Sequence, residues 1–125
     1  MSTLYIAPIN KESFALAAST GAGVLQVKCS GNGDADMTPY LAPFLRLVHE
    51  RAQSEDVRSI EFDFHDLYFL NSSCIKCFIV WLDALKSDSS KSYQVRFVTN
   101  TKLHWQRRSL AALRYFASEI VSVVA

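Results

Sequence analysis

Glycine and proline are absent from residue 44 onward in this 125-residue chain. All four glycines (Gly21, Gly23, Gly31 and Gly33) lie in the first third, and the last proline is Pro43. Because these two residue types interrupt regular backbone, their absence favours helices and strands joined by short polar turns over the rest of the chain.

Long apolar runs and an excess of one charge are also missing. The longest apolar run, Cys77 to Leu82, has six residues, whereas a membrane-spanning helix needs about 20. The N-terminus has no basic segment followed by an apolar one, so we expect no secretory signal. Thirteen Lys and Arg residues against twelve Asp and Glu residues leave a formal charge of +1, too little for general binding of nucleic acid or anionic lipid. The sequence therefore predicts a cytoplasmic protein that binds neither membrane nor nucleic acid.

Signatures of enzymes and metal sites are lacking as well. The chain contains no G-x-S-x-G motif, no phosphate-binding loop and no metal-ligand pattern. Its three cysteines (Cys29, Cys74 and Cys77) are an odd number without the spacing of a disulfide framework, and one isolated Cys-x-x-Cys does not predict structural zinc. We expect a protein that is not an enzyme and that holds no metal or cofactor.

The apolar content is sufficient for one packed core. Half of the residues are hydrophobic and 20% are charged, a balance typical of folded domains. A chain of this length is too short for two independent cores, so residues 1–125 are predicted to form a single domain. Residues 1–10 are expected to be a loose leader or an edge strand, with the leader extending as far as residue 12.

Hydrophobic periodicity predicts the order of the elements. The expected strands are Ser13–Ser19, Val24–Ser30, Arg58–His65 with a continuation through Leu70, Tyr93–Thr99 and Ile120–Val124, and the expected helices cover about 39–53, 72–86 and 102–116. Predicted turns lie at 20–23 (a hairpin), 31–36 and 87–92. Strands that alternate with helices predict an α/β fold with a mixed, largely parallel sheet flanked by helices, in the order β-β-α-β-α-β-α-β.

Polar residues before each expected helix are candidates for N-caps. Asp36 or Thr38 precedes the first helix, the triplet from Asn71 to Ser73 precedes the second, and Asn100 with Thr101 precedes the third. Within the second helix, Phe78, Trp81 and Leu85 recur at helical spacing and are expected in the core. They would become a docking surface if part of that row were exposed.

The segment from Ile60 to Ser73 carries the most specific pattern in the chain. It reads Ile-Glu-Phe-Asp-Phe-His-Asp-Leu-Tyr-Phe-Leu-Asn-Ser-Ser. This segment resembles the central signature of STAS domains, the family that includes the anti-sigma factor antagonists. In that signature an apolar strand with an aspartate leads to Asp-Ser-Ser-Gly at a helix start. Without a gap, Asp63 matches the strand aspartate and Ser72 matches the serine that those proteins phosphorylate.

Two positions depart from the STAS signature. Asn71 replaces the usual aspartate and Cys74 replaces the usual glycine. The substituted stretch, Asn-Ser-Ser-Cys-Ile-Lys-Cys, is similar to that of the SiaC-like STAS-type regulators. Members of that group bind and activate a diguanylate cyclase when they are unphosphorylated.

The resemblance implies a bacterial partner-switching regulator. A serine kinase would phosphorylate Ser72, with Ser73 as the second choice, and a PP2C-like phosphatase would reverse the modification. The implied partner-binding residues are Asp63, Asp66, Asn71, Ser72, Ser73 and Lys76. The regulated target would be a diguanylate cyclase or an anti-sigma factor, bound by a monomer or a weak homodimer.

Two other interpretations remain open from the residues alone. Cys74 and Cys77 open a helix after a strand, as in dithiol redox proteins, although no proline follows residue 43 to supply the cis-proline of that fold. Alternatively, Ser72 is only a helix cap, and the protein is a constitutive STAS-like scaffold or ligand binder.

Overall fold

The computed structural model describes residues 6–87 and 93–125. Its strands are β1 (Ile9–Asn10), β2 (Phe14–Gly21), β3 (Val24–Gly33), β4 (Ser59–Leu70), β5 (Gln94–Val98) and β6 (Val121–Val124). Its helices are the 3-10 turn η1 (Ala35–Met37), α1 (Thr38–Ser54), α2 (Ser72–Ser87) and α3 (His104–Phe116). The predicted α/β order is confirmed, with η1 added; β1 is the edge strand that was one of the two expectations for residues 1–10.

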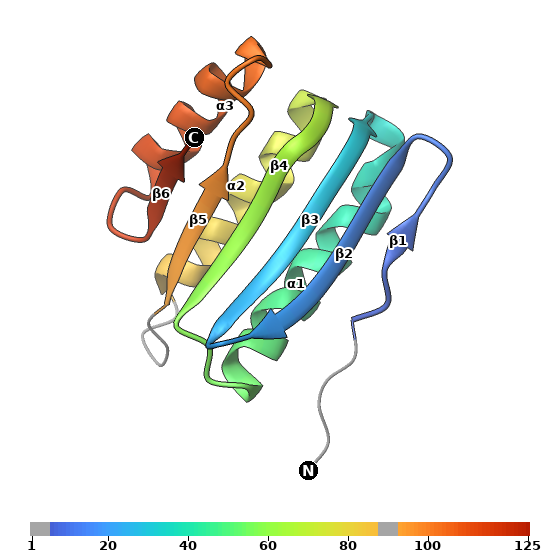
Figure 1. The fold of residues 1–125 in the computed structure, drawn as a ribbon. Helices are drawn as coiled ribbons and strands as arrows, with labels where there is room; N and C mark the ends of the chain where they lie inside the picture. The colour runs from blue at the N-terminus through green and yellow to red at the C-terminus, as the bar shows by residue number, and fades with distance from the viewer. Residues whose placement is uncertain (1–5, 88–92) are drawn as a thin grey trace.

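The strands form one sheet in the order β1-β2-β3-β4-β5-β6. The pairs β1–β2 and β2–β3 are antiparallel, whereas β3, β4, β5 and β6 are parallel to one another. Each parallel connection carries one helix, and the three helices lie on the same face of the sheet (Figure 1). From β3 to β6, each new strand is added on the same side of the previous one, and parallel strands are joined by right-handed crossovers. All three connecting helices therefore lie on one face of the sheet. The largely parallel sheet was predicted correctly.

The β2–β3 hairpin is confirmed, but β3 is longer than predicted. Ala22 and Gly23 form a two-residue turn with φ values of 55° and 79°, as in the hairpin turns that match strand twist. Residues 31–33, predicted as part of a polar turn, continue β3 and pair with β4. Gly31 makes this extension feasible: its φ is +91°, and an added Cβ would lie 2.1 Å from the Ser13 carbonyl oxygen.

The predicted caps of the first and third helices are wrong. Met37 and Leu103 occupy the N-cap positions, and neither makes a side-chain cap hydrogen bond. The Thr38 hydroxyl instead donates to the Ala35 carbonyl oxygen, because η1 runs directly into α1 and supplies a preceding backbone turn. The Asn100 Oδ1 atom accepts from the amide of Lys102, and Lys102 lies two positions before the start of α3.

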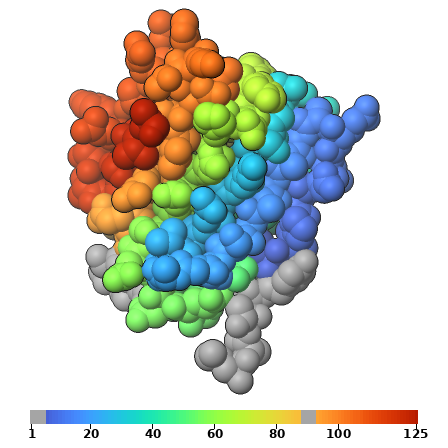
Figure 2. Space-filling view, in the orientation of Figure 1, coloured from blue at the N-terminus to red at the C-terminus, as the bar shows by residue number. Residues whose placement is uncertain are grey.

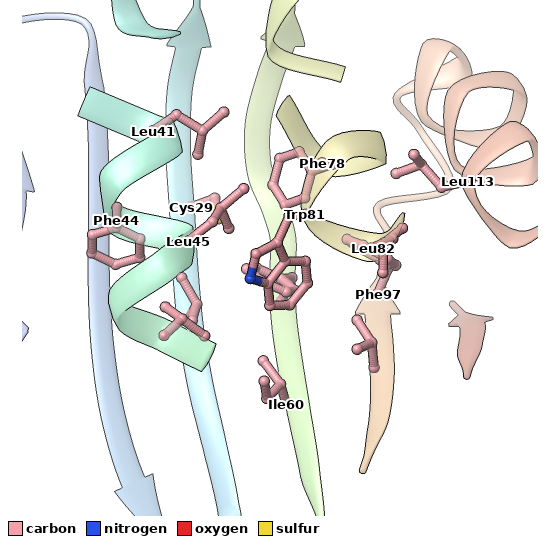
Figure 3. Close-up of a cluster of buried hydrophobic side chains, with 14 of the residues drawn as sticks. Cys29, Leu41, Phe44, Leu45, Ile60, Phe78, Trp81, Leu82, Phe97 and Leu113 are labelled. Atoms are coloured by element: carbon pink, nitrogen blue, oxygen red, sulfur yellow. The ribbon is translucent and has the colours of Figure 1, made fainter. Parts of the chain in front are cut away.

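The core lies between the sheet and the three helices (Figure 3). Four phenylalanines at its centre (Phe62, Phe64, Phe78 and Phe97) have ring centroids 5.3–6.4 Å apart. Such edge-to-face and offset arrangements stabilise a core beyond the burial of area alone. Phe78, Trp81 and Leu85 are buried, as predicted from their spacing.

The opposite face of the sheet carries polar side chains and no helix. In Figure 2, which has the orientation of Figure 1, the side chains of the strands form the surface on this side. The Glu61 carboxylate accepts from Gln26 Nε2 at 3.1 Å and pairs with Arg96 Nη1 at 3.4 Å, so one network links three strands. The alternation predicted over residues 58–65 is therefore confirmed: Ile60, Phe62 and Phe64 are buried on the helical side, whereas the polar residues between them face out.

The N-terminal segment is held more closely than a loose leader where the structure describes it. Ile6 is buried in the core, and β1 forms a short edge strand. Residues 1–5 and the predicted turn from 88 to 92 lie outside the described residues. The predicted strand over 120–124 and the helix over 72–86 are confirmed to within one residue at each end.

Candidate functional site

Asn71 caps α2 and so determines what its serine neighbours can do. The Asn71 Oδ1 atom accepts from the Ser73 amide at 2.9 Å and from the Ser73 hydroxyl at 2.7 Å. The Asn71 carbonyl oxygen accepts from the amides of Cys74 and Ile75, which begins the helical pattern. Asn71 thus satisfies amides that would otherwise lack partners at the helix start.

Ser72 is left exposed at the first position of α2. Neither its hydroxyl nor its amide makes a hydrogen bond with any residue that the structure describes. Ser73, by contrast, is half-buried and its hydroxyl is already bonded to Asn71. A phosphoryl group could therefore join Ser72 without breaking a bond of the cap, and the helix N-terminus favours the added negative charge.

Lys76 lies one turn after Ser72 on α2 and is also exposed. Side chains four residues apart are neighbours on a helix surface, so the ammonium group of Lys76 is within reach of a charge on Ser72. Asn71, Ser72, Ser73 and Lys76 of the predicted set are therefore brought together at one end of α2.

Two exposed aromatic residues stand beside this cluster and were not predicted. Tyr68 is 56% exposed and Phe69 is 44% exposed, at the end of β4 just before Asn71. The signal was present in the sequence, because Leu67-Tyr68-Phe69-Leu70 in a strand cannot direct all four side chains into the core. Exposed aromatic residues at the carboxyl end of a parallel strand are typical of contact surfaces.

Gln106 is a third residue whose role was not predicted. It is fully buried, and its Nε2 donates to the carbonyl oxygens of Phe64 at 2.7 Å and Leu67 at 2.9 Å. Pairing of β4 with β5 ends at Asp63, so residues 64–70 have no strand on that side. Gln106 and Asn100, whose Nδ2 donates to the His65 carbonyl oxygen, take the place of the missing strand and hold the segment that leads to Ser72.

Asp63 and Asp66 lie on β4, away from the α2 cluster. Asp63 is seven residues before the end of β4, about 23 Å along an extended strand, and its Oδ1 accepts from the His65 amide. Asp66 pairs with Lys28 at 3.9 Å. The structure thus does not place Asp63 next to Ser72, and partner binding by these two carboxylates stays a prediction.

The two cysteines of α2 do not have the properties of a redox pair. Cys74 is buried, and its thiol donates to the carbonyl oxygens of Gly33 and Asp34. Burial raises the pKa of Cys74 to about 11, with smaller contributions from Cys77 and Asp34, and burial also raises the pKa of Cys77. Reactive thiols need a lowered pKa, so this environment argues against the dithiol interpretation.

Comparison with known proteins supports the fold. Within the described residues, no helix is both long and apolar enough to cross a membrane. No protein-family model and no curated protein matches the sequence. Among solved structures, an anti-sigma factor antagonist from Mycobacterium paratuberculosis is similar with a TM-score of 0.64 and 16% sequence identity, over 90% of this chain and 86% of that chain. The STAS-like α/β fold expected from residues 60–73 is thereby confirmed.

Proposed function

We propose that this protein is a non-enzymatic STAS-type regulator whose binding to a partner protein is switched by phosphorylation of Ser72. The unmodified protein binds its target through the start of α2 and the adjoining end of β4. A serine kinase adds the phosphoryl group, and a PP2C-like phosphatase removes it. The target is an anti-sigma factor or a diguanylate cyclase.

The single observation that carries this proposal is the division of roles between Asn71 and Ser72. Capping, the ordinary reason for a serine at a helix start, is performed here by Asn71. Ser72 has no structural task among the described residues, yet it is exposed at the signature position that the STAS resemblance assigns to the phosphorylated serine.

The size of the charge explains how one modification could control binding. Phosphorylation adds a charge of about −1.5 to −2 at one point of the surface. Against a partner shaped for a neutral hydroxyl, burial or like-charge contact of that group costs several kcal/mol. Each 1.4 kcal/mol changes affinity tenfold, so the modified protein would release its partner while the fold persists.

The test begins with mass-spectrometric mapping of phosphate on the full chain isolated from its own cells. We expect phosphate on Ser72. Affinity capture is then compared between the parent protein and the variants Ser72→Asp, Ser72→Ala and Ser73→Ala. Ser72→Asp should lose the partner with an unchanged circular dichroism spectrum, whereas Ser72→Ala should retain it. Ser73→Ala is the matched control, because it removes the neighbouring hydroxyl.

Two results would contradict the proposal. One is equal capture of the same partner by Ser72→Asp, Ser72→Ala and the parent protein. The other is phosphate on a different residue, or none, when the kinase is present and active.

A further inference from the structure

A groove runs between α1 and α2 on the helical side of the molecule. Its volume is about 580 Å³, within the range of sites that hold small molecules. The small side chains of Ala42 and Ala84, one on each helix, leave the space open. Leu45, Trp81 and Leu85 form buried parts of its wall, and Figure 3 shows Trp81 between the two helices on the side of Leu45.

The centre of this groove is an exposed apolar surface. Val80 lines it and is 61% exposed, more than Val124, which is 40% exposed. The Val80 side chain contributes little hydrophobic stabilisation while it is exposed to water. An apolar ligand that covered it would gain binding free energy from its burial.

The basic groups that line the groove are Arg46, His49 and Lys76, and no carboxylate is among the lining residues in the described part of the chain. Neither Arg46 nor Lys76 has an ion-pair partner among residues 6–87 and 93–125. Because the whole chain has a formal charge of only +1, two unpaired cations in one groove are a local concentration of positive charge. The groove is therefore complementary to an anion.

The two ends of the groove differ in polarity. Both helices connect parallel strands, so they run in the same direction and start at the same end of the molecule (Figure 1). Thr38 and Ser73 come from the first turns, where the helix dipoles add positive potential, and Lys76 follows one turn after the start of α2. Ala84 and Leu85 come from the opposite end, about 18 Å from Ser73 along the helix axis, and His49 of α1, which is hydrogen-bonded to Tyr93, lines the groove at that end as well.

We propose that this groove binds a single-chain amphiphile with an anionic head group, such as a long-chain carboxylate. The head lies at the helix N-termini beside Lys76 and within reach of Arg46. The tail extends along Val80 and Trp81 toward Leu85. The combination of an unpaired cationic end, an apolar stretch along Val80 and Trp81, and a far end formed by Ala84, Leu85 and His49 favours this occupant over a peptide helix, which would need apolar contacts along its whole length. The proposal does not depend on phosphorylation of Ser72.

Dodecanoate, below its micelle-forming concentration, is the probe for this proposal. Isothermal titration calorimetry with the full chain should give saturable binding at one site, with a change in tryptophan fluorescence from Trp81. Hexanoate should bind far more weakly, because each buried methylene contributes about fourfold to affinity. Dodecyltrimethylammonium, which has a similar tail and the opposite charge, should also bind more weakly.

Three variants locate the site. Val80→Arg places a charge in the middle of the apolar channel and should weaken dodecanoate binding by at least about tenfold. Lys76→Glu should weaken it about fivefold and reduce the preference for the anion. Tyr115→Arg is the matched control: Tyr115 is 91% exposed on α3, outside the groove, and this variant should bind as the parent protein does.

The proposal is overturned by three results. These are no saturable binding of dodecanoate to the parent protein, equal binding by Val80→Arg, or equal affinity for the cationic amphiphile. If Val80→Arg instead loses a captured partner protein while the parent does not bind dodecanoate, the groove is a protein-docking surface and the proposal is wrong.

Discussion

Replacement of Gln106 by leucine tests whether the buried amide holds the end of β4. Leucine has a similar size but cannot form hydrogen bonds, so the Phe64 and Leu67 carbonyl oxygens lose their Gln106 donor. The Asn100 amide loses the Gln106 Oε1 acceptor, which lies at 2.8 Å. Each buried group without a partner costs about 1–3 kcal/mol. The three losses sum to about 3–9 kcal/mol, and the more favourable burial of leucine offsets about 2 kcal/mol, which leaves a net loss of about 1–7 kcal/mol.

Urea unfolding followed by circular dichroism measures this loss. Whole domains are stable by only about 5–15 kcal/mol, so the variant should unfold at a lower urea concentration, and its Tm should fall by about 4–28 °C. Arg108→Leu is the control, because it makes the same kind of change at an exposed position of the same helix. If Gln106→Leu loses less than about 1 kcal/mol, or no more than Arg108→Leu, the reasoning about the β4 edge is refuted.

The α2 cap and the cysteines give three further predictions. Asn71→Asp keeps an acceptor for both Ser73 bonds and adds a negative charge at the helix start, so the free energy of unfolding of the unphosphorylated protein should rise by about 0.3–1 kcal/mol. Asn71→Ala removes the acceptor and should lower the free energy of unfolding by about 1 kcal/mol. If urea unfolding shows that both variants lose the same free energy of unfolding, Asn71 is not the cap. Because burial raises the pKa of Cys74 to about 11, iodoacetamide should label the folded protein slowly below pH 10, and rapid labelling at pH 7 would contradict the burial argument. An unfolded thiol ionises near pH 8.5 while the folded thiol stays neutral, so the free energy of unfolding should decrease as the pH rises from about 9 to 11.

Most of the fold could be predicted because its signals are local. The alternation of Ile60, Phe62 and Phe64 has the period of a strand with one buried face, and the structure buries all three. The order of strands and helices then restricts the topology, since parallel strands joined by helices take right-handed crossovers. The same reasoning failed at Gly31, where a positive φ and a close approach to Ser13 allow a strand to continue through residues that are typical of a turn.

The candidate site was predicted only in part because some of its features depend on distant contacts. The cluster from Asn71 to Lys76 is continuous in sequence, so its position on a helix start could be predicted. The role of Gln106 could not, because it depends on β4 extending beyond β5, a difference in strand length that no local pattern reveals. The only signal was Gln106 itself, a polar residue near the apolar side of the predicted helix. An exposed position for Gln106 would have fitted that pattern equally well.

The assignment of the cap to Asn71 also explains how a neutral residue can replace the usual aspartate of the STAS signature. The cap needs an oxygen acceptor, which an amide and a carboxylate both provide. The two differ in charge, and a carboxylate beside Ser72 would repel a phosphoryl group on that hydroxyl. With asparagine, the helix start keeps its hydrogen bonds and its positive potential remains available to a phosphoryl group. In the proposed switch, stability and regulation thus depend on different side chains, so phosphorylation of Ser72 would leave the hydrogen bonds of the cap in place.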